Sequence, residues 1–392
     1  MVRLKDIASR MRLSVSTVSA ILNTRDPRYN GVTRTRVMKV AKTLGYRTNR
    51  HAQMLRHGRT GFVGVVHPDL STQVSTIAKN HLIRELRQKG WYPLEYNARW
   101  FENDLKMGLR ATFDHLLEAR IEGLVLVRPS SWVPRCEIAR IRNAGIPMVS
   151  QHGISVPGSP QIRADVRGAM RDLTWHMVRL GHRHLLLLTR GFCADPASVV
   201  DRPILDRIQG FQEAITQAQE QGRSVRGEVV QEPLASPPSN SSAMGQRAME
   251  EILRRPRRPD AVLCTNDFWA LGAMRACSQA GLRVPHDMAL AGFDNEFFGQ
   301  FLPSALTTVQ QPDREEARCT VEMLSRLIRG ERLPRGERNV ILPCELVIRE
   351  SCGAHVSAGI STSSDPVVRG GNGGNHAMDN LDLPDFVTPL KE

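Results

Sequence analysis

The chain has 392 residues, a formal net charge of +13, 41% hydrophobic residues and seven scattered cysteines. An odd number of cysteines without a Cys-x-x-Cys pair or Cys/His cluster indicates neither a disulfide framework nor a zinc site. We therefore expect buried thiols in a reducing compartment, and no metal or cofactor. No apolar run approaches the ~18 residues of a membrane span, and the start lacks a signal-peptide core. These features predict a cytoplasmic, nucleoid-associated protein without a membrane partner.

Nearly all of the net charge lies in the first sixty residues, which hold fourteen Lys or Arg and two acids, Asp6 and Asp26. The rest of the chain is close to neutral. A dense basic block on a neutral body is typical of a nucleic-acid-binding head. The alternative is a disordered basic tail, and the apolar periodicity of the block argues against it.

Three successive stretches of this block carry apolar residues at helical spacing. They are Leu4, Ile7, Ala8 and Met11; then Val18, Ile21 and Leu22; then Val37, Val40, Ala41 and Leu44. We expect the third helix to be capped at its start by Thr33 and to stop at Gly45. Helices this short are marginal alone in water, so the pattern predicts a three-helix bundle.

The segment 4–23, LKDIASRMRLSVSTVSAILN, resembles the helix-turn-helix of the lac and gal repressor family, and 33–46 resembles its third helix. The segment 49–58, NRHAQMLRHG, is similar to the family's hinge helix. The resemblance implies that the second helix enters the major groove of double-stranded DNA. Arg12 stands where the family commonly has Gly. A positive φ is uncommon for a non-glycine residue, so we expect a strained or differently shaped turn.

The helix-turn-helix geometry, together with the resemblance of 49–58 to the family's hinge helix, implies three kinds of DNA contact. Base readout falls to Val15, Ser16 and Ala20. Contacts with the DNA backbone fall to Thr17, Ser19, Asn23 and Thr33. The minor-groove hinge contains Asn49, Ala52 and Leu55, with Leu55 as the wedge that kinks the duplex. The alternatives are that Val15 simply packs in the head and that Leu55 packs against its own hinge.

The body alternates short apolar runs with amphipathic stretches. The runs are 62–66, 92–96, 123–127, 147–150, 185–188, 261–264 and 288–293. This alternation predicts βαβ units and parallel sheets, and nearly 300 residues exceed what one core usually fills. We therefore expect two subdomains with a ligand between them, at the carboxyl ends of the strands.

The family resemblance continues through this body, in LGHRH (180–184), RPDAVLCTND (258–267), GLRVP (281–285), GFD (292–294) and LTTVQ (306–310). It implies an all-α helix-turn-helix head and an α/β body like periplasmic binding proteins, with two doubly wound parallel-sheet subdomains. Crossovers between them are expected near Ile162, Thr308 and Arg332. The expected domains are 1–47 (helix-turn-helix), 48–60 (hinge helix and linker), 61–355 (effector binding and dimerisation) and 356–392 (disordered tail).

The resemblance places Arg207, Asn266 and Asp294 at the effector, with His152 and Asp69 also lining the cleft. A guanidinium, an amide and a carboxylate suit vicinal hydroxyls, which favours a sugar. Each has a local alternative: Arg207 pairing with Asp206 on the surface, Asn266 tying a strand end, and Asp294 capping a loop. The segment 72–75 lacks the aromatic residues that the family often has there. A phosphorylated sugar, another small metabolite or no effector therefore remain alternatives.

The sequence predicts a DNA-binding transcriptional regulator, most often a repressor, whose operator affinity depends on a small molecule. Without a heptad pattern in the tail, we expect a homodimer on a pseudo-palindromic operator. We find no catalytic motif in the sequence, so we do not expect an enzyme. An architectural DNA-binding protein is the alternative, and it would show neither sequence selectivity nor an effector response. The head and the missing export signal exclude a transport-type binding protein.

Overall fold

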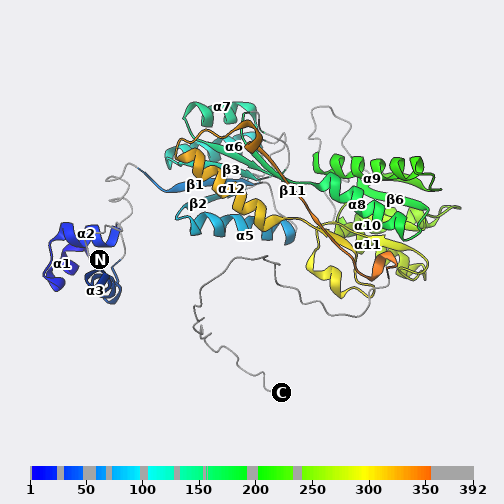
Figure 1. Ribbon diagram of the computed structural model, residues 1–392, viewed down its shortest axis with the longest axis horizontal. Coiled ribbons are helices and arrows are strands. Elements are labelled where there is room, and N and C mark those ends of the chain that lie inside the picture. Colours follow the sequence, from blue (N-terminus) through cyan, green and yellow to red (C-terminus); the bar gives the residue numbers. More distant parts are fainter. Residues whose placement is uncertain are drawn as a thin grey trace, which may run out of the picture. The chain divides into compact units, whose positions relative to one another are not determined.

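The computed structural model describes residues 2–23, 31–46, 59–67, 73–97, 105–127, 133–152, 156, 158–191, 202–232 and 241–354. Within these ranges the chain forms a helical head and an α/β body with two parallel sheets (Figure 1). The predicted fold class is therefore confirmed.

The head consists of α1 (Leu4–Met11), α2 (Val15–Asn23) and α3 (Gly31–Thr43). Every apolar residue of the three predicted stripes belongs to its core, in which Ile7, Val18 and Val37 are fully buried. The prediction that Thr33 caps the third helix is wrong. The helix begins at Gly31, whose carbonyl already accepts a hydrogen bond from the Thr35 hydroxyl, 2.8 Å away.

The turn between α1 and α2 passes through Arg12, which has φ 54° and ψ 43°. This left-handed conformation confirms the expectation for a residue that stands where the family commonly has Gly. The Leu13 N–H donates to the Ala8 carbonyl (3.0 Å) and ties the turn to the end of α1. The side chain of Arg12 therefore sits on a backbone geometry that favours glycine.

The first subdomain is built on a parallel sheet in the order β11-β5-β4-β3-β1-β2. Its strands are β1 (Phe62–His67), β2 (Tyr92–Asn97), β3 (Gly123–Val127), β4 (Met148–Gln151), β5 (Gln161–Ala164) and β11 (Asn339–Leu342). One face packs against α5 (Gln73–Gln88) and α12 (Asp313–Ile328), and the other against α6 (Leu105–Glu118) and α7 (Arg135–Asn143). Figure 1 shows α12 among elements from the first third of the chain.

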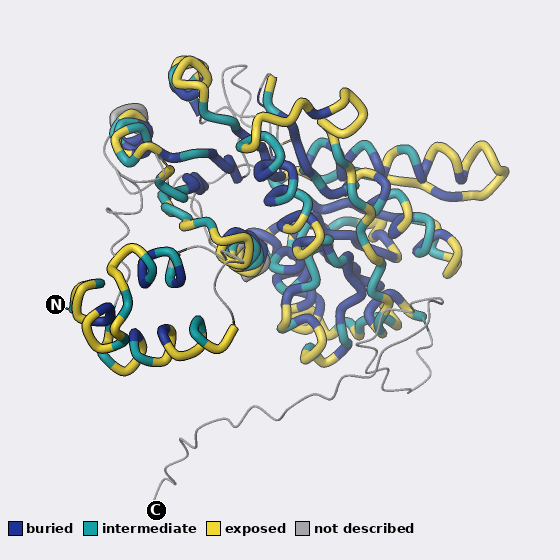
Figure 2. The backbone as a smooth tube through the Cα atoms, turned by 60° about the vertical axis from the view of Figure 1, so that its left-hand side comes forward, coloured by how far each residue is buried: buried dark blue, intermediate teal, exposed yellow. Residues whose placement is uncertain are grey.

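The second subdomain is built on a parallel sheet in the order β7-β6-β8-β9. Its strands are β6 (His184–Arg190), β7 (Arg226–Glu232), β8 (Ala261–Cys264) and β9 (Ala289–Ala291). Leu185 and Leu187 face α8 (Val166–Arg179) and α9 (Arg202–Glu220), whereas Leu186 faces α10 (Ser241–Leu253) and α11 (Asp267–Gln279). Strands β6, β8 and β9 are mostly buried, β7 has no buried residue, and the outer helix faces are exposed (Figure 2).

The chain passes between the subdomains three times. It leaves β5 for α8 at Asp165, and it leaves β10 (Thr308–Gln310) for α12. The third passage leads from β11 to β12 (Glu345–Val347), which pairs antiparallel with β10. The prediction of a crossover near Arg332 is wrong, because β11 comes after that residue and still pairs with β5 in the first sheet.

The thiols divide by environment. Cys264, Cys277 and Cys352 are buried, which agrees with the expectation, but Cys136 is exposed and contradicts it. Cys136 lies in the first turn of α7, on the side away from the buried Ile138 and Ile141. Burial raises the pKa of Cys277 to about 11, so this thiol stays protonated.

Candidate DNA-binding head and effector site

The start of α2 is fixed by Ser14. Its hydroxyl oxygen accepts a hydrogen bond from the Thr17 N–H (3.0 Å), which satisfies one of the free amides at the helix N-terminus. The same hydroxyl lies within hydrogen-bond distance of the Ser16 and Thr17 side chains (2.7 and 2.8 Å). The first turn of α2 is therefore held by a short hydroxyl network.

The side chains predicted to meet base edges lie on the outer surface of the head. Val15 is 47% exposed, so it is not explained by packing, and Ser16 is also exposed. Ala20 and Thr17 are half-buried, whereas Ser19 is only 9% exposed. The structure thus brings Val15 and Ser16 together on an open face, and it turns Ser19 inward.

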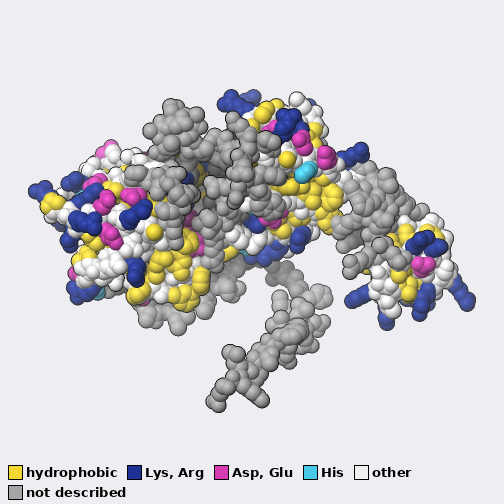
Figure 3. Space-filling model, turned by 180° about the vertical axis from the view of Figure 1, so that it is seen from behind, with side chains coloured by type: hydrophobic (Ala, Val, Ile, Leu, Met, Phe, Trp, Pro, Cys, Tyr) yellow, Lys and Arg dark blue, Asp and Glu magenta, His cyan; other side chains and the backbone are white. Residues whose placement is uncertain are grey.

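Basic side chains cover much of the head (Figure 3). Its described residues include one acid, Asp6, and these Lys and Arg residues: Arg3, Lys5, Arg10, Arg12, Arg34, Arg36, Lys39 and Lys42. Asp6 accepts a hydrogen bond from the Arg3 N–H (2.7 Å) and so closes the start of α1. The positive charge suits a phosphate backbone.

Several predicted site residues cannot be placed. Asn49, Ala52, Leu55 and Asp69 lie outside the described residues, as does the tail 356–392. Asn23 is the last residue of α2, and its side chain is not described.

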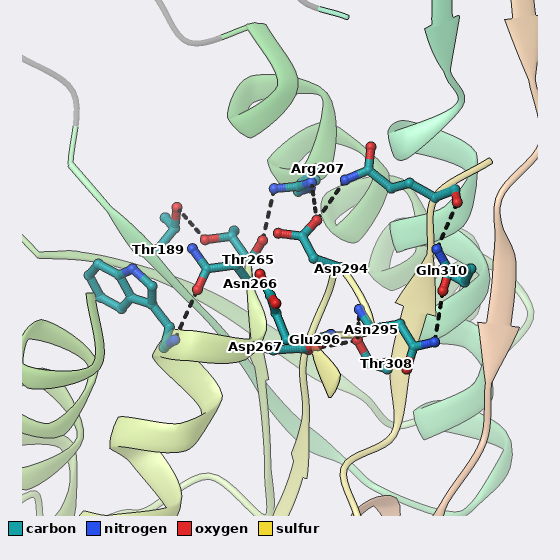
Figure 4. A network of polar contacts seen from close by, with 12 residues as sticks. Thr189, Arg207, Thr265, Asn266, Asp267, Asp294, Asn295, Glu296, Thr308 and Gln310 are labelled. Carbon is teal, nitrogen blue, oxygen red and sulfur yellow. Dashed lines mark hydrogen bonds and ion pairs between the residues drawn. The ribbon is translucent and has the colours of Figure 1, made fainter. Parts of the chain in front are cut away.

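Arg207 is the centre of a polar network at the carboxyl edge of the second sheet (Figure 4). It lies on α9 and is only 8% exposed. Its guanidinium donates to the Thr265 carbonyl (2.8 Å) and to the Asp294 carboxylate (3.2 Å), and it stacks 4.0 Å from the ring centroid of Phe293. The alternative of a surface pair between Arg207 and Asp206 is wrong, since Asp206 pairs with Arg202 instead.

Asp294 connects this network to the crossover that leads to α12. It follows β9 with a φ of 106°, and its Oδ1 also accepts a hydrogen bond from the Gln311 side-chain amide (2.6 Å). Gln311 is buried and lies three residues after the start of β10. Asp294 therefore does more than cap a loop, because it joins α9 to the crossover.

Asn266 has a local role, but it caps a helix and does not tie a strand end. Its Oδ1 accepts a hydrogen bond from the Trp269 N–H (2.9 Å) and caps α11. Since the carbonyl oxygen is used by the cap, the Nδ2 amide is the part of this side chain that can donate to a ligand. Figure 4 shows Asn266 beside Thr265, close to the Arg207–Asp294 pair.

Asp267 supports the loop that carries Asp294. It is fully buried and accepts hydrogen bonds from the Glu296 N–H and the Thr308 hydroxyl, both at 2.6 Å. Burial raises the pKa of Asp267 to about 8, and the nearby Asp294 carboxylate adds to the rise while the Thr308 hydrogen bond opposes it. The Asp267 carboxyl therefore holds the loop that carries Asp294 in place.

His152 belongs to the other subdomain. It follows β4 with a φ of 53°, it is 7% exposed, and its Nε2 lies 2.7 Å from Glu316 Oε2 on α12. No contact joins it to Arg207, Asn266 or Asp294 among the described residues. The structure thus gathers three of the predicted effector residues and pairs His152 elsewhere.

Sequence reasoning missed Ser14, Gln311 and Asp267. Ser14 has the residue type and position of a helix N-cap, directly before an apolar stripe, so a signal existed. Gln311 comes directly after the landmark 306–310, but nothing in the sequence marks it as an Asp294 partner. Asp267 sits beside Asn266 within a matched motif, and its burial was not foreseeable.

Two family profiles match the chain. "Bacterial regulatory proteins, lacI family" matches residues 3–49, and "Periplasmic binding protein-like domain" matches residues 174–352. The first covers the helical head, and the second covers most of the second subdomain together with the second and third crossovers.

Relatives match over nearly the whole chain. The HTH-type transcriptional regulator MalR of Streptomyces coelicolor is 30% identical over 356 residues, covering 89% of this chain and 96% of that protein. A structure of the lac repressor dimer bound to operator and the anti-inducer ONPF is 25% identical with a TM-score of 0.69, covering 90% and 99%.

The fold is also shared with a structure of the CelR–cellobiose complex, a transcriptional regulator that is 22% identical with a TM-score of 0.60, covering 90% of this chain and 100% of that one. Together with the helix-turn-helix head and the two-sheet body, these similarities establish the family of the chain. The chain belongs to the lacI family of bacterial regulatory proteins, as a DNA-binding transcriptional regulator with an effector-binding body, and is not an enzyme.

Proposed function

We propose that this protein is a cytoplasmic repressor that binds a pseudo-palindromic operator as a homodimer and is controlled by a carbohydrate effector. The proposed domain boundaries at residues 47, 60 and 355 separate the DNA-binding head, the hinge, the effector-binding body and the tail. In the described part of the chain, no helix is long and apolar enough to cross a bilayer.

The observation that carries the effector proposal is the buried Arg207–Asp294 pair. A guanidinium fixed on the Thr265 carbonyl and on Asp294, beside the Asn266 amide, offers donors and an acceptor in a rigid arrangement. Hydroxyl groups of a sugar can satisfy such groups, and a ligand without them leaves buried polar atoms unpaired. The cellobiose bound by a structural relative supports the same ligand class.

The effector signal would pass through Gln311. Because Gln311 contacts Asp294 and lies just before α12, a ligand at Asp294 changes what holds the crossover in place. The ligand can shift the subdomain arrangement only by its differential affinity for the two states. Induction and corepression are both compatible with this route.

Operator contacts are proposed for the residues that the resemblance assigned. Val15, Ser16 and Ala20 would meet base edges, Thr17, Ser19, Asn23 and Thr33 the DNA backbone, and Asn49, Ala52 and Leu55 the minor groove. The exposure of Val15 and Ser16 supports the first of these groups.

The homodimer is proposed to include η1 (Phe297–Phe301) of the second subdomain. Phe297 and Phe301 are 59% and 71% exposed, and their ring centroids lie 5.7 Å apart. Two adjacent exposed aromatic rings are typical of a protein interface. The solved lac repressor dimer supports a second copy of the chain as the partner.

Titration calorimetry of the full-length protein against a carbohydrate panel tests the effector proposal. We expect one sugar class to bind and to change operator affinity, and we expect Arg207→Ala to abolish both effects. Leu55→Ser tests the hinge. Operator affinity should fall sharply while non-specific DNA binding changes little. An equal loss on both DNAs would contradict a wedge at Leu55.

A further inference from the structure

Three ionisable side chains converge in the first subdomain, where the end of β4 meets the start of α12. His152, Asp313 and Glu316 are 7%, 5% and 0% exposed. One nitrogen or oxygen of each lies within 4.8 Å of the corresponding atom of the other two. Burial of two acids and an imidazole this close together is costly unless their polar atoms are satisfied.

Polar atoms of His152 and Glu316 have no hydrogen-bond partner among the described residues. Neither carboxylate oxygen of Glu316 has a hydrogen-bond partner there. The Glu316 Oε2 lies 2.7 Å from His152 Nε2, but the two groups lack the alignment of a hydrogen bond. An unsatisfied buried polar group is destabilising, so native structures rarely keep one without a bound ion or water.

Two neutral groups extend the cluster. Gln151 is 1% exposed, and both ends of its amide lack a hydrogen-bond partner among the described residues. It shares a sheet face with Val149, which packs on α12, because side chains two apart on a strand point the same way. Thr320, also buried with an unpartnered hydroxyl, lies one helical turn after Glu316.

We propose that His152, Asp313 and Glu316 bind a divalent transition-metal ion. An imidazole nitrogen and two carboxylate oxygens form a ligand set that Zn²⁺ and other divalent first-row transition metals accept. Donors about 2.1 Å from a tetrahedral ion lie roughly 3.4 Å apart, so small side-chain rotations convert the present spacing into a site. A neutral imidazole nitrogen is the commonest metal ligand among side chains, which favours a metal over an ammonium group.

Three protein ligands leave a coordination position open, as in metal sites that also bind a small molecule. Asp313 comes two residues after Gln311, whose amide holds Asp294. The ion would therefore lie on the same crossover as the effector network. Binding of the ion does not depend on the proposed function. An effect of the bound ion on operator affinity does rest on that function.

No motif in the sequence indicates this site, because its ligands come from segments far apart in the chain. Asp313 and Glu316 stand in the first turn of α12, where acids are common for their interaction with the helix dipole. Only the packing of α12 on β4 brings them to His152.

Titration of the chelator-stripped, full-length protein with Co²⁺ tests the proposal directly. Visible absorption reports the ligand type, since thiolate ligation adds an intense near-ultraviolet charge-transfer band and nitrogen or oxygen ligation does not. This matters because the chain has an exposed thiol, Cys136. Calorimetry of the same samples gives the stoichiometry.

Glu316→Gln keeps the shape of the side chain and removes its charge, and Asp313→Asn is a second variant. Each should weaken Co²⁺ binding by more than the ~10–100-fold that losing an outer partner of a ligand costs. Glu315→Gln is the matched control, because Glu315 is its neighbour on α12 and pairs with Arg318 instead. The control should bind Co²⁺ like the wild type.

We expect one ion per chain without a thiolate band. Absence of binding to the folded wild type, a thiolate band, or equal binding by Glu316→Gln would overturn the proposal. DNA selectivity is measured separately on the same samples. A protein that selects an operator but binds no Co²⁺ retains the proposed function and loses this site. A protein that binds Co²⁺ but selects no operator retains the metal site and contradicts the proposed function.

Discussion

The guanidinium of Arg207 donates to the carboxylate of Asp294 across 3.2 Å, and the Phe293 ring covers the guanidinium on one side. The pair joins α9 to the loop after β9. Since Arg207 is buried and also holds the Thr265 carbonyl, its fork is fixed before any ligand arrives. Preorganised donors of this kind favour ligand specificity over tolerance.

Arg207→Lys should weaken effector binding about 10–100-fold, which corresponds to losing one hydrogen bond to a charged group at ~1.5–3 kcal/mol. An ammonium keeps the charge but cannot span Thr265 and Asp294 as a fork does. Operator affinity without effector should stay unchanged. Calorimetry measures the effector affinity. Arg202→Lys, on the same helix but exposed, is the control, and equal losses in both variants would contradict the assignment.

Asp267 should make stability depend on pH. The pKa of Asp267 in the folded protein is raised from an ordinary 3.8 to about 8. Burial is the main cause, and the nearby Asp294 carboxylate raises the pKa further. Between these values the folded state holds a proton that the unfolded chain has lost. The contribution of Asp267 to the free energy of unfolding therefore falls as pH rises through this window and levels off above it.

Asp267→Asn cannot ionise, and its amide can still accept from the Glu296 N–H while donating to Thr308. Its Tm relative to the wild type should therefore rise from about pH 5 to about pH 9. Thermal unfolding at several pH values measures this difference. A Tm difference that stays constant with pH would show that Asp267 is ionised in the folded protein throughout.

Resemblance and periodicity predicted most strands of the two parallel sheets and missed β5, β7 and β11. The run 261–264 is β8 as predicted, because a strand buried on both faces is apolar throughout. β7 was missed, since this edge strand, with the sequence RGEVVQE, has no buried residue and few apolar ones. β11 was also missed, at an edge of the first sheet, and this explains the misplaced third crossover.

The effector site was predictable only where a motif marked it. Arg207 and Asp294 were assigned from the resemblance, and the structure brings them into contact. The Gln311 contact was not predictable, because a local pattern says nothing of which loop a glutamine will meet. His152 was assigned to the cleft, yet its neighbour Glu316 depends on how α12 packs on the sheet.

Arg12→Gly should stabilise the head by about 1 kcal/mol, because Arg12 holds a left-handed backbone that glycine adopts without a side-chain penalty. Hydrogen exchange of the α1 and α2 amides in the full-length protein measures the effect, and we expect slower exchange. Arg10→Gly, inside α1, should instead speed exchange, because glycine destabilises a helix interior. Faster exchange in Arg12→Gly would show that the arginine side chain stabilises the turn.

Phe301→Glu should dissociate the homodimer. A charge at a buried aromatic contact costs at least about 2 kcal/mol, a roughly 30-fold weaker association. Sedimentation velocity over a range of concentrations reports the shift to monomers. Ile341→Glu is the control, since Ile341 is also exposed but lies on β11 of the other subdomain. An unchanged dimer in Phe301→Glu would place the interface elsewhere.

Genome-wide sequencing of DNA fragments bound by the purified protein tests the central proposal most directly. It is done near physiological salt, which suppresses non-specific electrostatic binding, and with Val15→Glu as a matched variant on the exposed face of α2. We predict sharp peaks over one pseudo-palindromic sequence for the wild type and their loss in the variant. Diffuse binding without a shared sequence, alike in both proteins, would contradict a sequence-specific repressor and favour an architectural role.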